Sequence, residues 1–210
     1  MSVGPNDATR RPRVAALVLA AGTGSRFGGI KVLARLGDRP LLQHVLDACA
    51  AAGLAEVVVV VGAAADEIEA AIAWRSERRV RNPHPDAGLA SSLRLGLGAL
   101  GPGIDAALVL LGDQPLVRPE VIRLVAEAAG RTDRPIIIPR YAAGGGGNPA
   151  LIRRSAWSQA GGLAGDRGFG PLVAAHPELA HEVPVEGANP DVDTPGDLAA
   201  LARTDGAGVA

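Results

Sequence analysis

The stretch that decides the fold is VAALVLAAGTGSRFGGIK, residues 14–31, in which an apolar run passes directly into a glycine-rich loop. Val14–Leu19 has no polar residue, which is typical of a strand buried on both faces. Four glycines among residues 22–29 let the backbone turn sharply and approach a ligand closely. Arg26 and Lys31 add two cations beside backbone N–H groups that suit phosphate oxygens. The stretch therefore predicts a polyphosphate site, and the alternative is an ordinary strand-to-helix turn with solvated charges.

Two common phosphate-binding patterns do not fit this loop. The dinucleotide pattern G-x-G-x-x-G would need a glycine where the chain has Phe27. The P-loop pattern fails because its second glycine, at position 29, is followed by Ile30 and Lys31 instead of Lys and Ser or Thr. The loop is therefore of a third type, which is longer and carries its own arginine.

Outside this stretch, apolar runs alternate with helical patterns. Strands are expected at 14–19, 56–61, 79–82, 106–111, 136–139 and 182–185, and helices at 40–52, 64–73, 89–99, 119–129, 169–175 and 195–201. The runs at 57–61 and 106–111 are continuously apolar, which is typical of strands covered on both faces of a mainly parallel sheet. We therefore predict an α/β fold, in which ligands bind at the carboxyl ends of the strands.

Composition narrows the classes of function. The 210 residues are expected to form one domain, residues 14–203, between disordered tails at 1–13 and 204–210. A net charge of −1 without a basic block argues against nucleic acid. No run reaches the ~20 apolar residues of a membrane span, and the N-terminus lacks the apolar core of a signal peptide. Cys49 is the only cysteine, so a reducing cytoplasm fits, and its helical setting predicts a buried hydrophobic residue.

Carboxylates in two distant segments indicate a metal site. Asp113 ends a buried strand, where it needs a hydrogen-bond or cation partner, and capping of the next loop is the structural alternative. We interpret Asp191 as part of a capping loop before the last helix, with Thr194 as its N-cap. Asp113 and Asp193, together with a phosphate loop, would suit Mg²⁺, which takes one or two carboxylates and completes its shell with water and substrate phosphate.

Three further polar segments carry candidate residues. Ser91 and Ser92 open a predicted helix, where they either cap it or face a base or ribose. Residues 141–149 contain four consecutive glycines and form either a mobile substrate loop or a flexible hairpin. Residues 165–168, Gly-Asp-Arg-Gly, form a polar turn. The four histidines show no metal-ligand spacing.

Taken together, these motifs resemble the MobA-like nucleotidyltransferases, and within them the molybdenum cofactor cytidylyltransferase branch. The resemblance is spread over residues 19–31, 37–42, 88–97, 112–117, 147–151, 165–168 and 191–198. It implies a three-layer, Rossmann-like α/β fold with a mainly parallel sheet. It also implies an NTP on the glycine loop, Arg26 and Lys31 on its phosphates, and Mg²⁺ held by Asp113 and Asp193.

The resemblance assigns the remaining roles. Guanylyl-transferring relatives tend to have glycine at the position of Ala21, so the alanine favours CTP. The expected catalytic residues are Arg26, Lys31 and Asp113. The expected nucleotide-binding residues are Leu19, Ala20, Ala21, Gly22, Thr23, Gly24, Ser25, Arg26, Lys31, Gly88, Ser91 and Ser92. The expected acceptor-binding residues are Gly147, Asn148, Pro149 and Arg167.

Two departures from the family pattern fall on the acceptor side. The family's Gly-His-Pro has Asn148 in the place of histidine, and Phe169-Gly170 stands where a small residue and then arginine are expected. The function implied is transfer of CMP from CTP to a molybdopterin-type acceptor, with a molybdoenzyme or its maturation chaperone as a further partner. Three alternatives stay open: an NTP transferase for another phosphorylated acceptor, an NAD(P)H-dependent reductase, and a nucleotide-binding cofactor chaperone.

Overall fold

The elements of the fold follow the predicted alternation of strands and helices. A computed structural model describes residues 10–22, 24, 27–144 and 146–206. The strands are β1 (Val14–Ala20), β2 (Arg35–Leu36), β3 (Arg39–Pro40), β4 (Glu56–Val61), β5 (Arg78–Arg81), β6 (Ala106–Leu111), β7 (Ile136–Tyr141), β8 (Ala150–Arg153) and β9 (Ala180–Val185). The α-helices are α1 (Leu41–Ala52), α2 (Ala65–Ala71), α3 (Leu89–Ala99), α4 (Pro119–Ala128), α5 (Gly170–Ala175) and α6 (Pro195–Gly206). The 3₁₀ segments are η1 (Lys31–Leu33), η2 (Pro85–Ala87), η3 (Arg154–Gly162) and η4 (Pro177–Leu179).

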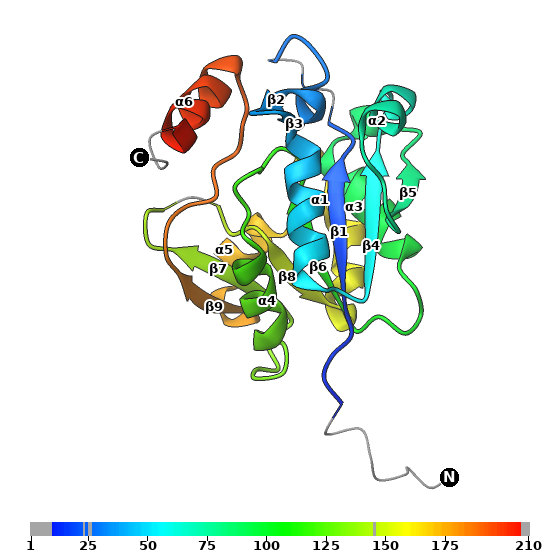
Figure 1. Ribbon diagram of the computed structural model, residues 1–210. Coiled ribbons are helices and arrows are strands. Elements are labelled where there is room, and N and C mark those ends of the chain that lie inside the picture. Colours follow the sequence, from blue (N-terminus) through cyan, green and yellow to red (C-terminus); the bar gives the residue numbers. More distant parts are fainter. Residues whose placement is uncertain (1–9, 23, 25–26, 145, 207–210) are drawn as a thin grey trace, which may run out of the picture.

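Seven strands form one sheet in the order β5-β4-β1-β6-β8-β7-β9, with β1 near its middle (Figure 1). β1 pairs in parallel with β4 and β6, and Leu17 lies opposite Val58 on one side and Val109 on the other. β8 runs antiparallel to both of its neighbours, β6 and β7, whereas β7 and β9 are parallel. The predicted mainly parallel sheet is therefore confirmed.

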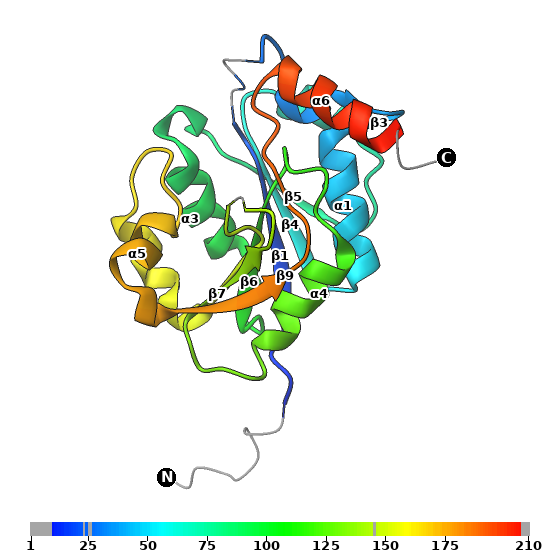
Figure 2. The ribbon, with the colours of Figure 1, turned by 90° about the vertical axis from the view of Figure 1, so that its left-hand side faces the viewer.

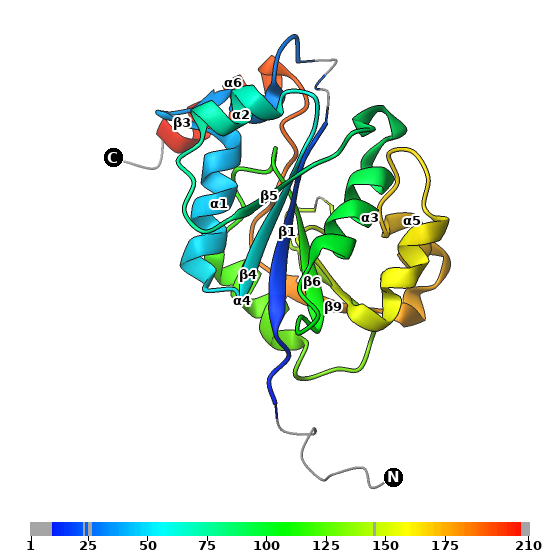
Figure 3. The same cartoon turned by 90° about the vertical axis from the view of Figure 1, so that its right-hand side faces the viewer.

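Helices cover both faces of the sheet, as Figures 2 and 3 show from opposite sides. Ala16 and Val18 of β1 belong to the cluster that packs under α1 and α4. Ala15 and Leu17 belong to the second cluster, beneath α3 and η3. All four side chains are fully buried, which explains why this strand has no polar residue at either face. The three-layer α/β arrangement predicted from the sequence is confirmed.

Several short elements of the fold were not predicted, among them the two-residue strands β2 and β3, which pair with each other. β8 has only four residues, too few for its periodicity to distinguish strand from helix. The glycine-rich residues 141–149 connect β7 to this strand, its antiparallel neighbour. The long 3₁₀ segment η3 was also not expected.

The ends of the described chain bear on the predicted domain limits. Arg10, which precedes the predicted start of the domain at residue 14, forms an ion pair with Asp105 at 2.9 Å. Helix α6 continues to Gly206, beyond the predicted end at residue 203. Residues 1–9 and 207–210 lie outside the described residues, and the domain limits stay a prediction.

Two expectations from composition can be compared with the structure. Cys49 is fully buried in α1, and burial, together with the charge of Glu77, raises the pKa of its thiol to about 12. The residue is therefore a buried small hydrophobe, as predicted. Among the helices in the described part of the chain, none is both long enough and apolar enough to cross a membrane.

Candidate functional site

The glycine loop begins where three parallel strands end side by side. The N–H of Gly112, just after β6, donates to the carbonyl of Leu19 at 2.9 Å. Gly62, just after β4, lies so close to the loop that an added Cβ would be 2.5 Å from the carbonyl oxygen of Ala21. Only a residue without a side chain fits there, so Gly62 fixes the position of the loop. Gly62 was not among the predicted site residues, although a glycine directly after an apolar strand is a signal that the sequence contains.

A cavity of about 280 Å³ lies beside this loop. Of the predicted nucleotide-binding and metal-binding residues, those that line it are Leu19, Ala20, Ala21, Gly22, Gly24, Lys31, Gly88, Ser92 and Asp113. Thr23, Ser25 and Arg26 lie outside the described residues. Ser91 and Asp193 do not line the cavity. The structure thus brings together predicted residues from three distant segments at the carboxyl ends of the strands.

The two serines of α3 are held by a residue that the sequence analysis missed. Asn82, 4% exposed, donates from Nδ2 to the hydroxyls of Ser91 at 2.8 Å and Ser92 at 2.9 Å. The Ser91 hydroxyl donates to the carbonyl of Gly88 at 2.9 Å. Gly88, and neither serine, occupies the N-cap position of α3, so the expectation that one serine caps this helix is wrong.

Lys31 joins the two carboxylates that the sequence singled out. Its Nζ lies 3.0 Å from Oδ1 of Asp193 and is also ion-paired with Oδ2 of Asp113. The side chains of Lys31 and Asp113 are 15% and 17% exposed, whereas Asp193 is 54% exposed. Burial lowers the pKa of Lys31, but the hydrogen bonds and charges of the two carboxylates outweigh it, so the pKa lies above its ordinary value. Lys31 therefore stays charged, and both carboxylates face one point.

This arrangement fits a hydrated divalent cation. Oδ1 of Asp113 is buried and has no hydrogen-bond partner among the residues that the structure describes, so it is available to them as an unused acceptor. The described residues contain no group of three or more His, Cys, Asp or Glu side chains able to hold a metal. A donor set of two carboxylates suits Mg²⁺, which completes its shell with water and substrate phosphate.

Asp191 has a different role from the predicted one. Its Oδ1 accepts a hydrogen bond from Nε2 of Gln114 at 2.8 Å, so it braces the loop after β6. Partial burial raises the pKa of Asp191, and the charge of Asp113 raises it further. Thr194 and Asp197 cap the start of α6 reciprocally. The N–H of Thr194 donates to Oδ2 of Asp197 at 2.8 Å, and the N–H of Asp197 donates to the hydroxyl oxygen of Thr194 at 3.2 Å. The interpretation of Asp191 as a capping residue is wrong, and that of Thr194 is confirmed.

A second cavity, of about 480 Å³, adjoins the first. Its walls are mostly apolar and include Leu93, Ile136, Ile138 and Phe169. The predicted acceptor-binding residues that line it are Gly147, Asn148 and Arg167, whereas Pro149 is buried and does not. The carbonyl of Asn148 accepts from the Tyr141 hydroxyl at 3.0 Å, and from Nδ2 of buried Asn189 at 3.4 Å.

The polar turn at 165–168 lies against the start of α3 and separates the two cavities. The N–H of Ala90 donates to the carbonyl of Gly165 at 3.0 Å, and the N–H of Leu89 donates to Oδ1 of Asp166 at 3.3 Å. A Cβ on Gly88 would come within 2.4 Å of the carbonyl carbon of Gly165. Asp166 lines both cavities. This turn therefore connects the predicted nucleotide segment to the predicted acceptor segment.

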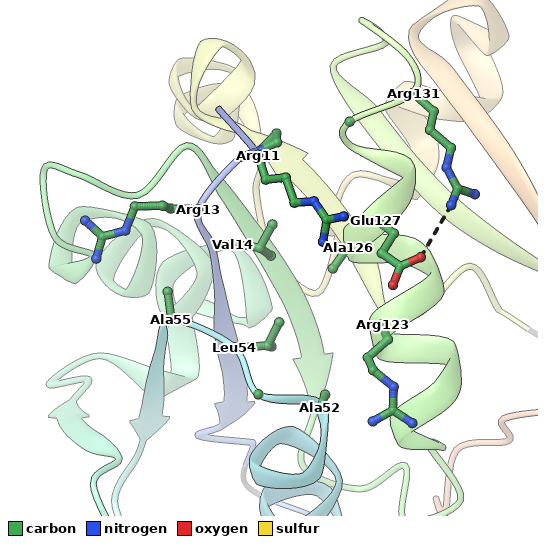
Figure 4. Close-up of a pocket in the computed structure, with 13 residues that line it drawn as sticks. Arg11, Arg13, Val14, Ala52, Leu54, Ala55, Arg123, Ala126, Glu127 and Arg131 are labelled. Carbon is green, nitrogen blue, oxygen red and sulfur yellow. Dashed lines mark hydrogen bonds and ion pairs between the residues drawn. The ribbon is translucent and has the colours of Figure 1, made fainter. Parts of the chain in front are cut away.

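A third cavity, of about 600 Å³, lies at the amino end of β1 (Figure 4). Its cationic residues are Arg11, Arg13, Arg123 and Arg131. Arg131 is ion-paired with Glu127 at 3.4 Å, and Arg123 with Glu120 at 2.9 Å. None of the predicted site residues lines this cavity, and ligands of such sheets bind at the opposite, carboxyl ends of the strands. Although it is the largest of the three, we do not place the active site there.

Comparison with known proteins is consistent with this geometry. Residues 16–181 match the MobA-like NTP transferase domain, and the chain belongs to this family. The bifunctional protein GlmU of Sorangium cellulosum is 37% identical over 137 residues, which are 61% of this chain and 29% of GlmU. The chain thus spans less than a third of the length of that curated relative.

Solved structures resemble the chain over most of its length. Rv0371c from Mycobacterium tuberculosis H37Rv is 31% identical with a TM-score of 0.82, covering 92% of this chain and 100% of that one. A complex of Rv0371c with manganese is 29% identical, with a TM-score of 0.78 and the same coverage. A nucleotidyl transferase from Methanothermobacter is 28% identical with a TM-score of 0.75, covering 91% of this chain and 97% of that one.

Proposed function

We propose that this member of the MobA-like NTP transferase domain family transfers CMP from CTP to the phosphate of a molybdopterin-type cofactor and releases pyrophosphate. The observation that carries the proposal is that Lys31, beside the glycine loop, pairs both with Asp113 after β6 and with Asp193 from the segment before α6. The combination of a cation for phosphate and carboxylates for a metal suits a nucleoside triphosphate.

The chemistry needs positioning and charge neutralisation more than a general base. A phosphate monoester has a second pKa of about 6, so the acceptor is largely a dianion at pH 7. One of its oxygens attacks the α-phosphorus of CTP, and the bond from that phosphorus to the leaving pyrophosphate breaks. Lys31 neutralises phosphate charge, and Arg26 is proposed from the sequence to stabilise the pyrophosphate.

A divalent cation, when bound, would supply further charge neutralisation on the triphosphate. Asp113 and Asp193 are the residues that would hold it, because both face the point that Lys31 Nζ contacts. The manganese complex of the relative Rv0371c supports a divalent metal in this family. We propose Mg²⁺ as the ion because two carboxylates with water and phosphate match its preferred shell.

The surroundings of Ala21 support CTP over GTP. Its side chain is 6% exposed, and its carbonyl is tightly packed against Gly62. Ala21 also lines the first cavity, so its methyl group would leave less room there than a glycine would. A purine needs more room than a pyrimidine, so a methyl group here works against GTP.

The lining of the second cavity supports an acceptor with a flat ring over a polyhydroxylated sugar. Each sugar hydroxyl buried against an apolar wall without a hydrogen-bond partner is costly. The cavity offers few polar side chains, among them Asn148 and Arg167, which suit the edge of a heterocycle and a phosphate. We propose the cytoplasm as the location and a molybdoenzyme or its maturation chaperone as the receiver of the product.

The test is incubation of the protein with Mg²⁺, molybdenum-loaded molybdopterin and each of the four NTPs in turn. We expect the cytosine dinucleotide of the cofactor, with CTP preferred over GTP. Asp113→Asn should slow product formation about 10²–10³-fold, whereas Glu127→Gln, the same carboxylate-to-amide change in the distant third cavity, should not. If another phosphorylated metabolite is cytidylylated and molybdopterin is not, the acceptor assignment is wrong. If no NTP is consumed with any acceptor, the transferase assignment is wrong.

A further inference from the structure

We infer that Lys31 occupies the metal position in the free protein, and that a divalent cation enters only together with a triphosphate that draws Lys31 away. This inference rests on the proposed function, because it places the metal and the triphosphate at the same site. It adds an order of binding that neither the family nor its relatives assign to this chain.

The geometry shows that one cation already occupies the point between the carboxylates. A single ammonium, Nζ of Lys31, is paired with Asp113 and with Asp193. The two carboxylates come from segments 80 residues apart in the chain, yet both are directed at this one group. A metal ion held by the same two side chains would be next to the ammonium. Two cations repel each other strongly at such a short separation, especially where water is partly excluded.

The ion pair is shielded enough for this competition to matter. Lys31 and Asp113 are both less than one-fifth exposed, so solvent screens their charges less than it screens a surface pair. Asp113 is anchored by its backbone, since its carbonyl accepts a hydrogen bond from the N–H of Val192 at 3.1 Å. The same hydrogen bond holds the segment that carries Asp193. The carboxylates therefore stay in place whether or not Lys31 remains between them.

The ammonium nevertheless satisfies this site incompletely. It is paired with Oδ2 of Asp113, whereas Oδ1 of the same carboxylate is buried and finds no partner in the described part of the chain. A hydrated divalent ion carries water molecules whose hydrogens can serve such an acceptor. The carboxylate pair thus has capacity for a better-matched cation once Lys31 leaves.

A triphosphate provides the reason for Lys31 to leave. Lys31 lines the first cavity, beside Gly22 and Gly24. Phosphates bound to the glycine loop would therefore lie within reach of its flexible side chain. Once Lys31 pairs with phosphate, Asp113 and Asp193 are left as two negative charges without a counterion. Triphosphate binding then favours metal binding, and by thermodynamic reciprocity metal binding favours triphosphate binding to the same extent.

Titration with Mn²⁺, followed by the electron paramagnetic resonance signal of the free ion, tests this order without any turnover. Wild-type protein should bind Mn²⁺ weakly alone, and on the order of tenfold or more tightly with an α,β-methylene analogue of CTP. Lys31→Met should bind Mn²⁺ without the analogue on the order of tenfold more tightly than wild type does. Lys31→Arg keeps the positive charge and should stay as weak as wild type. Lys31→Met combined with Asp113→Asn should lose the gain, which would locate the ion at this site.

Two results would overturn the inference. One is a Lys31→Met variant, folded as judged by thermal unfolding, that binds Mn²⁺ no more tightly than wild type. The other needs no variant: wild-type protein that binds Mn²⁺ equally tightly with and without the analogue. Either result leaves the proposed function standing if CMP transfer is observed. Failure of the wild type to bind the CTP analogue in calorimetry would instead count against the proposed function itself.

Discussion

The two adjoining cavities at the carboxyl ends of the strands are built in opposite ways. The first cavity, which we propose for the nucleotide and call the nucleotide cavity, is formed largely by the contiguous loop after β1, together with charged side chains such as Lys31 and Asp113. The second cavity, which we propose for the acceptor and call the acceptor cavity, is formed by apolar side chains from α3, β6, β7, β8 and α5. A contiguous motif with its own charges indicates which kind of reaction a site can support. A cavity assembled from scattered apolar residues indicates mainly the shape of the molecule that it can hold. Under the proposed function, the first cavity would define the chemistry, and the second cavity would define which molecule undergoes it.

The largest effect should come from Asp113→Asn on the nucleotide side. The change keeps the size of the side chain but removes a charge that faces Lys31 and the proposed metal, so turnover should fall about 10²–10³-fold, the scale of losing one electrostatic contact to the reacting groups. Pyrophosphate release with saturating acceptor measures it, and acceptor binding should be unchanged. Turnover within a factor of two of wild type would remove Asp113 from the chemistry.

Gly62→Ala should have the next largest effect, through the backbone of the loop. Its new Cβ would be 2.5 Å from the carbonyl oxygen of Ala21, so the loop or β4 must move. Crowding of this kind costs about 1–3 kcal/mol of the free energy of unfolding, and we expect CTP affinity to fall with it. Gly98→Ala is the matched control, because it is an exposed helix position where a Cβ meets nothing within 4 Å. Equal denaturation midpoints and CTP affinities for the two variants would contradict the close packing.

Arg167→Ala should act on the acceptor cavity alone. If Arg167 contacts the acceptor phosphate, its removal should raise the KM for the acceptor about tenfold, the scale of one charge-assisted hydrogen bond. The dissociation constant of CTP, measured by calorimetry, should not change. A change in CTP affinity with an unaltered acceptor KM would place Arg167 on the nucleotide side.

Asp166→Ala should have a smaller effect, which should appear in the KM values of both the nucleotide and the acceptor. Asp166 lines both cavities and accepts a hydrogen bond from Leu89 at the start of α3. We expect a loss of about 0.5–1 kcal/mol in unfolding free energy, as for a weak helix cap, and increases of a few-fold in both KM values. Asp166→Asn keeps an acceptor oxygen and should recover most of the stability. An effect confined to one substrate would show that the turn does not link the two cavities.

Sequence patterns identified the residues of the site whose chemistry is carried by local context. Lys31 follows a glycine loop, and Asp113 ends an apolar run, so both were predicted and the structure brings them together. Asn82 and Gly62 were missed, and Asp166 was placed in a polar turn without a role of its own, because these roles depend on which segments approach in space. Asp191 was misinterpreted because Thr194 and Asp197, in the same short motif, satisfy the capping of α6 by themselves.

The fold was predictable to a similar extent and for similar reasons. The other six strands of the main sheet were predicted, although β5 is mostly arginine, whereas β8 is four residues long and was missed. The hairpin alternative for residues 141–149 indicated a turn there but did not identify the strand that follows it. Its place between β6 and β7 is set by pairing with both strands. Val109 of β6 lies far from β8 along the chain, and Ile137 of β7 lies across the connecting loop. Short strands of this kind are determined by tertiary contacts more than by their own sequence.

Transfer of a radioactive label from CTP to the acceptor tests most directly whether the nucleotide side defines a nucleotidyl transfer. CTP labelled at the α-phosphate and CTP labelled at the γ-phosphate are incubated separately with protein, Mg²⁺ and molybdopterin. We predict that the α-label appears in the modified acceptor and the γ-label in pyrophosphate, and that Asp113→Asn slows the appearance of both labelled products about 10²–10³-fold. Appearance of the γ-label in the acceptor, or of neither label in any product, would contradict this mechanism.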